Sequence, residues 1–149
     1  MQTVWLGGAE WLAVLRIGLG LWWLESWRHK DKKGWFERGT GIAWAADVAG
    51  KHKWPFVKRG FEKVVVPRPK AMAYVVVYAE LALGVGLIVG FLTPVALVGG
   101  LLLNLLYFVL MIHDWAEQGQ NAMMALISLV ALFAMSWQVW SLDHVIGIF

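Results

Sequence analysis

The chain has 149 residues, of which 60% are hydrophobic and only 15% are charged, and 11 are tryptophan. Soluble domains are usually about 45–50% apolar and about 25% charged, so this composition excludes a disordered chain and disfavours a soluble enzyme. The absence of cysteine excludes disulfides, thiol catalysis, iron–sulfur clusters and cysteine-linked haem. We therefore expect residues 1–149 to form one all-α integral membrane domain.

Four segments are long and apolar enough to cross a bilayer as helices, which takes about 20 residues each. They are residues 4–24, 71–91, 92–113 and 122–140. A tight turn joins the second and third spans, and Pro94 suits the first turn of the helix that follows. The short polar segment 113–121 joins the third and fourth spans. The predicted fold is a four-helix bundle that crosses the cell (inner) membrane several times.

The segment between the first two spans, Ser26–Lys70, holds nearly all of the basic charge. It carries 12 of the 13 Lys and Arg residues against four acidic residues. The positive-inside rule predicts that this loop is cytoplasmic and that both termini lie outside. We favour topology and attraction to anionic lipid over nucleic-acid binding as the reason for this charge.

Two short helices are expected within the basic loop. Ile42–Ala49 is apolar but too short to span a membrane. Pro55–Val66 places apolar side chains on one face and basic ones on the other, which is typical of an amphipathic helix lying at the lipid surface. Tryptophans near the ends of the spans, such as Trp5 and Trp137, indicate an aromatic belt.

Polar residues within the spans suggest where a site lies. Counted from the span midpoints at about 1.5 Å per residue, Arg16, Glu80, Asn104 and Ser128 come within one helical turn of a common depth. An unpaired charge in a bilayer costs several kcal/mol, so Arg16 and Glu80 are predicted to face each other. The alternative is that this polar layer only fixes the register of the helices.

Helical faces extend this prediction to a pocket that opens toward the cytoplasm. At 100° per residue, Gly20 shares a face of the first helix with Arg16 and leaves open space beside it. Ala82 and Gly86 lie opposite Glu80 and form a small-residue face for close helix packing. The residues expected to line the pocket and to bind a ligand are Arg16, Trp23, Trp27, Glu80, Asn104 and Phe108.

The histidines do not suggest a metal or haem site. His29 and His52 lie among lysines and are expected to be solvated. His113 and His144 are predicted on opposite sides of the membrane, whereas two haem ligands must converge on one iron. We therefore expect no haem, no iron–sulfur cluster and no metal.

Three sequences resemble the DoxX/DoxD family of small four-helix membrane proteins: RIGLGLWWLESWRHK (Arg16–Lys30), YAELALGVGLIVGFLTP (Tyr78–Pro94) and WAEQGQNAMMALISLVALF (Trp115–Phe133). WFERGTGIAWAADVAG (Trp35–Gly50) looks closer to the DoxD branch. That branch is associated with thiosulfate:quinone oxidoreductase, in which a DoxD-like subunit pairs with a second subunit. The resemblance implies a membrane subunit of a quinone-linked oxidoreductase, with quinone as substrate or bound ligand and with further membrane subunits as partners.

Within that hypothesis Arg16 and Glu80 are the candidate catalytic residues. Arg16 is expected to attract an anion such as thiosulfate or to donate to a quinone carbonyl, and Glu80 to exchange the proton that quinone reduction requires. Trp23, Trp27 and Phe108 offer flat surfaces for the ring. Two other classes remain open: a structural or assembly subunit of a larger electron-transfer complex without catalysis of its own, and a small transporter or lipid-binding protein.

Overall fold

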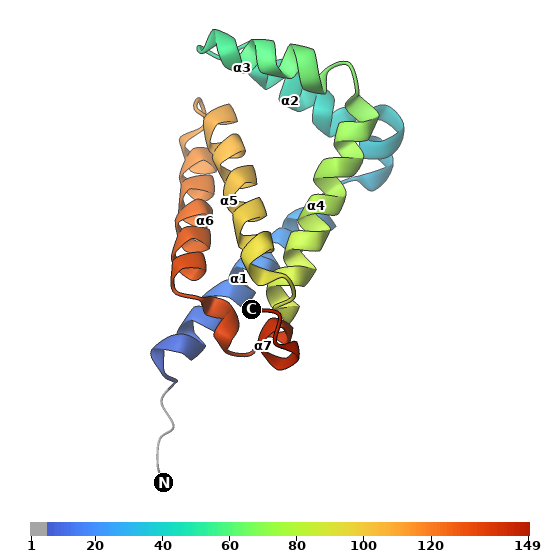
Figure 1. Cartoon of the computed structure of the whole chain (residues 1–149). Coiled ribbons are helices and arrows are strands. Elements are labelled where there is room, and N and C mark those ends of the chain that lie inside the picture. The colour runs from blue at the N-terminus through green and yellow to red at the C-terminus, as the bar shows by residue number, and fades with distance from the viewer. Residues whose placement is uncertain (1–5) are drawn as a thin grey trace.

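The computed structural model describes residues 6–149, and no β-strand occurs among them. Four long helices dominate the fold: α1 (Gly8–His29), α4 (Pro69–Val89), α5 (Thr93–Leu110) and α6 (Trp115–Phe133) (Figure 1). The prediction of an all-α protein is confirmed. Two of these helices, α4 and α5, are long and apolar enough to cross a membrane. The predicted start of the first span and Trp5 lie outside the described residues.

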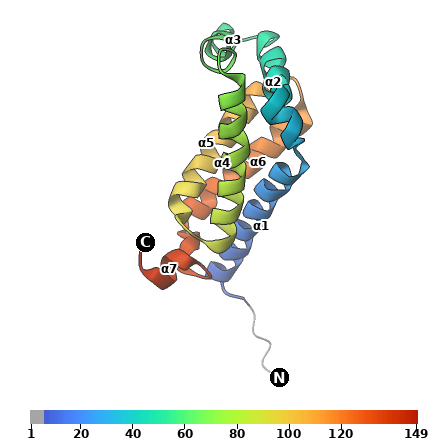
Figure 2. The same ribbon diagram turned by 90° about the vertical axis from the view of Figure 1, so that its right-hand side faces the viewer.

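The long helices pack around one apolar core. α1 lies along α4 and also contacts α6, and α5 packs against α6 and α4. Consecutive long helices run in opposite directions, so their connections gather at two ends of the molecule (Figures 1 and 2). The core between the helices consists of Leu19, Trp23, Leu83, Leu87, Leu97, Met124 and Ala131.

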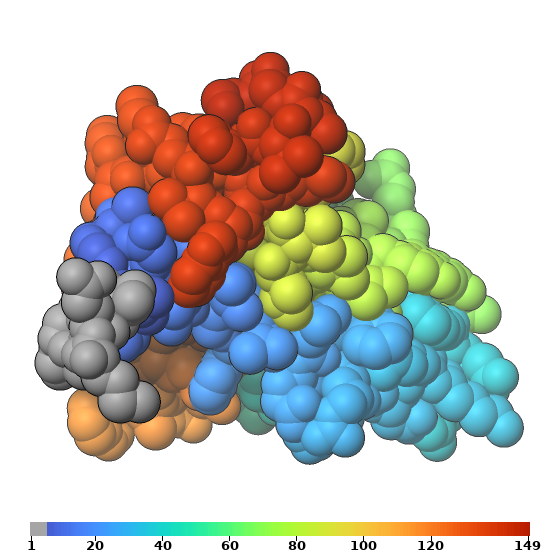
Figure 3. Space-filling model, turned by 90° about the horizontal axis from the view of Figure 1, so that it is seen from below, coloured from blue at the N-terminus to red at the C-terminus, as the bar shows by residue number. Residues whose placement is uncertain are grey.

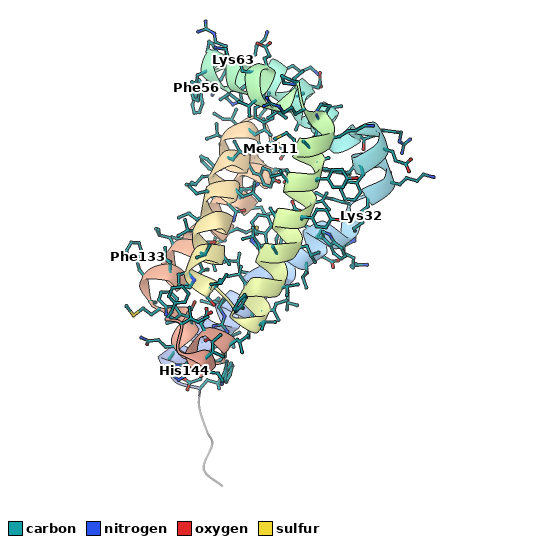
Figure 4. The ribbon with its side chains drawn as sticks, turned by 45° about the vertical axis from the view of Figure 1, so that its right-hand side comes forward. Lys32, Phe56, Lys63, Met111, Phe133 and His144 are labelled. Carbon is teal, nitrogen blue, oxygen red and sulfur yellow. The ribbon has the colours of Figure 1, made fainter. Side chains whose placement is uncertain are left out.

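The segment between α1 and α4 folds over one end, which we call the loop end. It contains the π-helix η1 (Gly34–Arg38), α2 (Thr40–Gly50), α3 (Pro55–Gly60) and the π-helix η2 (Phe61–Val65). Figure 4 shows Phe56 and Lys63 in this layer, beside the end of α5 where Met111 lies. The layer is attached through a second apolar cluster of Ala49, Val57, Leu110 and Met111.

His52 is part of this attachment, and its predicted solvation is wrong. Its side chain is buried, with only 7% of the residue exposed. The Trp54 amide donates to Nδ1 over 3.0 Å, so Nε2 donates to the Val109 carbonyl over 2.9 Å. The neighbouring lysines gave the wrong expectation because the chain turns at His52 and directs this one side chain inward against α5.

The opposite end, which we call the terminal end, is covered by the C-terminal segment. After α6 the chain forms a 3₁₀ turn, η3 (Ser136–Gln138), and the short helix α7 (Leu142–Ile146). The Asp143 carboxylate accepts from the amides of Leu92 and Thr93, each over 2.7 Å. Seen from this end in Figure 3, the C-terminal segment lies beside α1 and the start of α5.

The outer helices begin and end differently from the predicted spans. α1 extends to His29 rather than residue 24, and α6 occupies 115–133 rather than 122–140. α6 begins early because the Asp114 carboxylate caps it, accepting from the amides of Ala116 at 3.1 Å and Glu117 at 3.2 Å. The polar residues expected in a turn therefore form the first two turns of this helix.

Two glycines fix how α1 and α4 align. A Cβ added at Gly20 would lie 2.9 Å from the Gly84 carbonyl oxygen, and one at Gly84 would lie 2.7 Å from the Leu24 side chain. Because glycine has no side chain, the backbones of the two helices can approach closely here. The alignment puts Ser26 level with Glu80, and Arg16 level with the opposite end of α4. The close approach of α1 to α4 thus involves Gly84 rather than the predicted Ala82–Gly86 face.

Candidate functional site

A cavity of about 480 Å³ lies at the loop end. All four long helices contribute to its walls, and residues of η1, α2 and η2 contribute from the overlying layer. Its interior is largely apolar and contains a small set of polar side chains. This combination is typical of sites that bind small molecules and fix their orientation.

Glu80 is the central acidic group of the cavity and is completely buried. Its Oε2 accepts from Lys30 Nζ over 2.5 Å and from the Ser26 hydroxyl over 3.2 Å. Its Oε1 accepts from the Tyr107 hydroxyl over 3.4 Å. Lys30 Nζ also donates to the Ser26 hydroxyl over 3.2 Å. The buried carboxylate is therefore compensated by an ammonium group and by two hydroxyls.

Asn104 differs from Glu80 because it has no hydrogen-bond partner. The residue is completely buried, and both its amide nitrogen and its amide oxygen are unpaired. Trp23, which also lines the cavity, has an unpaired indole nitrogen. Buried polar side-chain atoms nearly always have a partner. An unpaired donor–acceptor amide and an unpaired indole N–H in one cavity indicate a place for a polar ligand group.

The charges around the cavity restrict the kind of ligand. Three carboxylate side chains line it, those of Glu80, Asp114 and Glu117, against the single ammonium group of Lys30 among its described lining residues. Lys30 is already engaged with Glu80. Asp114 and Glu117 are exposed, so water screens their repulsion of a dianion, but the lining ammonium group is not free to bind one. The cavity therefore favours a neutral head group over an anion.

The predicted contact between Arg16 and Glu80 is wrong. Arg16 lies at the terminal end, completely buried. Its Nη1 donates to the carbonyls of Ser136 at 2.7 Å and Val139 at 3.3 Å, and its Nη2 donates to the Trp140 carbonyl at 2.6 Å. The depth argument failed because α1 extends five residues further than expected and the Gly20–Gly84 contact sets a different register.

The six residues predicted to converge divide into two sets. Trp23, Glu80 and Asn104 line the cavity, whereas Arg16, Trp27 and Phe108 are not among its lining residues. The Trp27 ring instead lies under the Lys32 ammonium, 4.0 Å from the ring centroid. The side-chain amide of Gln118 donates to the Phe108 carbonyl over 3.5 Å.

Three residues of the site are absent from the predicted set: Ser26, Lys30 and Tyr107, the last of which is expected only to flank the Asn104 face. Lys30 follows Trp23 by seven residues, which returns it to the same helical face after two turns. That signal was lost because the first span was ended at residue 24 and Lys30 was counted with the charged loop. Tyr107 belongs to the turn that follows Asn104 on α5, so it was within reach of the same argument.

The histidines do not converge on one point of the fold, although two of them lie together at the loop end. His113 follows α5 at the loop end, where its ring centroid is 5.9 Å from that of His52. His144 belongs to α7 at the terminal end (Figure 4). Among residues 6–149 we find no group of three or more His, Asp or Glu side chains arranged to hold a metal ion.

The fold and the cavity define an all-helical membrane protein with a polar site at one end of its long helices. Residues 11–114 match the model of the DoxX family, so the chain belongs to the DoxX family. This range includes the cavity residues Trp23, Lys30, Glu80, Asn104 and Tyr107. Comparisons with curated proteins and with solved structures found no match.

Proposed function

We propose that this DoxX family protein is a membrane subunit of a quinone-linked oxidoreductase and that its cavity binds the quinone head group. The observation that carries the proposal is the completely buried, unpaired amide of Asn104 in the cavity that contains Glu80. A polar residue that served only to fix helix register would be expected to bond to a neighbouring helix. The unpaired amide therefore favours ligand binding over the structural alternative.

A quinone matches the groups that the cavity offers. It is neutral and planar, and each of its carbonyl oxygens accepts a hydrogen bond. Two unpaired donors, Asn104 Nδ2 and Trp23 Nε1, are available to these oxygens. The aromatic side chains of Trp23 and Tyr107 supply flat apolar surfaces for the ring. The lack of a free ammonium group among the described lining residues, which disfavours an anion, does not oppose a neutral ring.

Quinone reduction consumes two electrons and two protons and converts both carbonyl oxygens into hydroxyls. We propose that the protons come from the aqueous phase at the loop end. Lys30 is the intermediate position on this route, since its side chain is 14% exposed and its ammonium group touches the buried Glu80 carboxylate. Glu80 then acts as the group that delivers protons to the quinone oxygen.

The two electrons come, in this proposal, from a reduced sulfur compound such as thiosulfate, which is oxidised outside the cavity. Arg16 was the residue expected to attract such an anion, but it lies at the other end of the fold with its terminal nitrogens bound to carbonyls. Thiosulfate oxidation is therefore assigned, in this proposal, to a partner subunit that passes the electrons to the quinone. The proposed partners of this chain are that second subunit and the lipid bilayer.

We further propose that all four long helices cross the cell (inner) membrane. α1 and α6 have 22 and 19 residues, comparable to α4 and α5, and pack alongside them. The strongly basic loop end would then be cytoplasmic and both termini outside. The chain lacks cysteine, so single cysteines at Lys33 and His144 should be labelled from opposite sides of intact cells. Labelling of both from one side would contradict this topology.

The proposed function is tested by replacing Glu80 with glutamine, which keeps the shape of the side chain and removes its titratable group. The Glu80→Gln variant should retain extracted quinone, measured by mass spectrometry, and lose about 100-fold or more of quinol formation, the usual contribution of a positioned acid. Glu25→Gln is the matched control, because Glu25 is exposed on α1 and lies outside the cavity. Full activity in Glu80→Gln, or absence of quinone from the gently solubilised wild type, would contradict the proposal.

A further inference from the structure

A second hollow, larger than the polar cavity, lies along α4 and α5. It has a volume of about 900 Å³, and every residue that lines it is apolar or glycine. On α4 the small residues Ala79, Ala82 and Gly86 form one wall, and Ala96 and Gly99 contribute to the α5 wall. Small side chains at these positions leave a groove where larger ones would fill the space between the helices.

The groove adjoins the polar cavity. Leu103 and Leu106 of α5 line both hollows. Leu103 directly precedes Asn104, whose amide is unpaired, and Ala79 of the groove directly precedes Glu80 of the cavity. A molecule with its head at Asn104 therefore has an apolar surface next to it, along α4 and α5, for the rest of its length.

The groove lies on the two helices whose length and composition suit a membrane span. α4 and α5 are the two helices that are long and apolar enough to cross a membrane, and their splayed arrangement is visible in Figure 1. From Leu92 to Leu106 the groove follows α5 for roughly 20 Å, at 1.5 Å rise per residue. Leu142 of α7 lines it beside Leu92, so the C-terminal segment bounds its far end.

We propose that this groove holds the hydrocarbon tail of the ligand whose head group occupies the polar cavity, and that the ligand enters sideways from the bilayer between α4 and α5. The inference rests on the proposed function and adds the substrate class: a quinone with a long isoprenoid or alkyl tail rather than a water-soluble one. The shared wall of groove and cavity, formed by Leu103 and Leu106, carries it, because one amphiphilic molecule would satisfy both surfaces.

The experiment compares two probes in nanodiscs, a benzoquinone with a ten-carbon tail and the same head group without a tail, with binding followed by quenching of tryptophan fluorescence. Ala82→Phe fills the groove. It should weaken binding of the tailed probe about tenfold or more, the value of losing contact with about two methylene groups. Binding of the tailless probe should be unchanged.

Ala122→Phe is the matched control, since Ala122 is exposed on α6 and lines neither hollow. The tailed probe partitions into the bilayer to the same extent with either variant, so only Ala82→Phe should change the measured affinity relative to wild type. Should Ala82→Phe fail to fold, Gly99→Leu fills the opposite wall, where a Cβ makes an ordinary 3.5 Å contact with Leu83. Its control is Gly18→Leu, because a Cβ at Gly18 meets nothing within 4 Å.

Equal affinity of the tailed probe for wild type and both groove-filling variants would overturn the inference. A phospholipid that is bound in native mass spectrometry and is not displaced by the tailed quinone would also overturn it. A second copy of the chain cross-linked into the groove would overturn it as well. Failure of the proposed function looks different: the tailless probe would not bind wild type, or Asn104→Leu would leave its binding unchanged.

Discussion

The two ends of the molecule each bury a polar centre, and the centres serve different purposes. Arg16 at the terminal end and Glu80 at the loop end are both completely buried. The terminal nitrogens of Arg16 are occupied by three backbone carbonyls, and neither hollow reaches it. Glu80 lies beside a cavity in which the Asn104 amide is unpaired. Burial of a charge inside helices therefore does not by itself identify a ligand site.

The terminal centre is explained by the end of α6. Met135 adopts a left-handed conformation with φ 52°, which ends the helix and turns the following carbonyls toward α1. A buried arginine is stabilised by hydrogen-bond partners of this kind. Together with Asp143, which accepts from the turn before α5, Arg16 fastens the C-terminal segment to the rest of the fold. We infer that this centre provides stability.

The largest predicted effect is at the terminal end. Arg16→Leu should lower the free energy of unfolding by about 3 kcal/mol or more, because the carbonyls of three residues lose their buried donor. Thermal unfolding in detergent measures this loss. Arg28→Leu on the same helix should cost far less, since its ion pair with Glu25 is exposed and screened by water. Equal losses in the two variants would show that the Arg16 contacts do not stabilise the fold.

The second prediction tests which residue is the partner of Glu80. A double-mutant cycle of Lys30→Ala and Glu80→Gln should give a coupling of about 1–2 kcal/mol, within the range for residues in contact. A cycle of Arg16→Leu and Glu80→Gln should be additive, because the two residues lie at opposite ends of the α1–α4 contact. Coupling in the second cycle and not in the first would restore the pairing that the sequence suggested.

The sequence predicted the helical class of the fold better than it predicted which side chains contact each other. The all-α class follows from long apolar segments. Glu80 and Asn104 are predicted to face inward because polar groups within a span need partners, and Trp23 because it shares a helical face with Gly20. The Arg16 partner was not predictable in this way. It depends on where α6 ends and on a close approach at Gly20 and Gly84, and both are set by tertiary packing rather than by local pattern.

The loop end was misjudged for a related reason. Its basic residues were treated as one solvated group, yet Lys30 reaches inward to Glu80 over 2.5 Å and His52 packs against α5. Net charge predicts which side of a membrane a loop prefers, but it averages over side chains with different surroundings. A carboxylate buried nearby determines which lysine turns inward.

The smallest predicted effect is at the loop end, and it does not share the destabilising sign of Arg16→Leu. Asn104→Leu should leave the free energy of unfolding of the ligand-free protein unchanged or raise it by about 1 kcal/mol, because it removes a buried amide that has no partner and replaces it with an apolar side chain of similar size. Asn121→Leu is the matched control: the Asn121 amide donates to the Glu117 carbonyl over 2.8 Å, so the same substitution should cost about 1 kcal/mol. Both residues line the cavity, and thermal unfolding without added quinone compares them directly.

A stabilised Asn104→Leu that no longer binds quinone would show that this amide is kept for the ligand at the expense of stability. A loss as large as that of Asn121→Leu would instead mean that Asn104 has a structural partner, and the case for a ligand at the loop end would lose its main support.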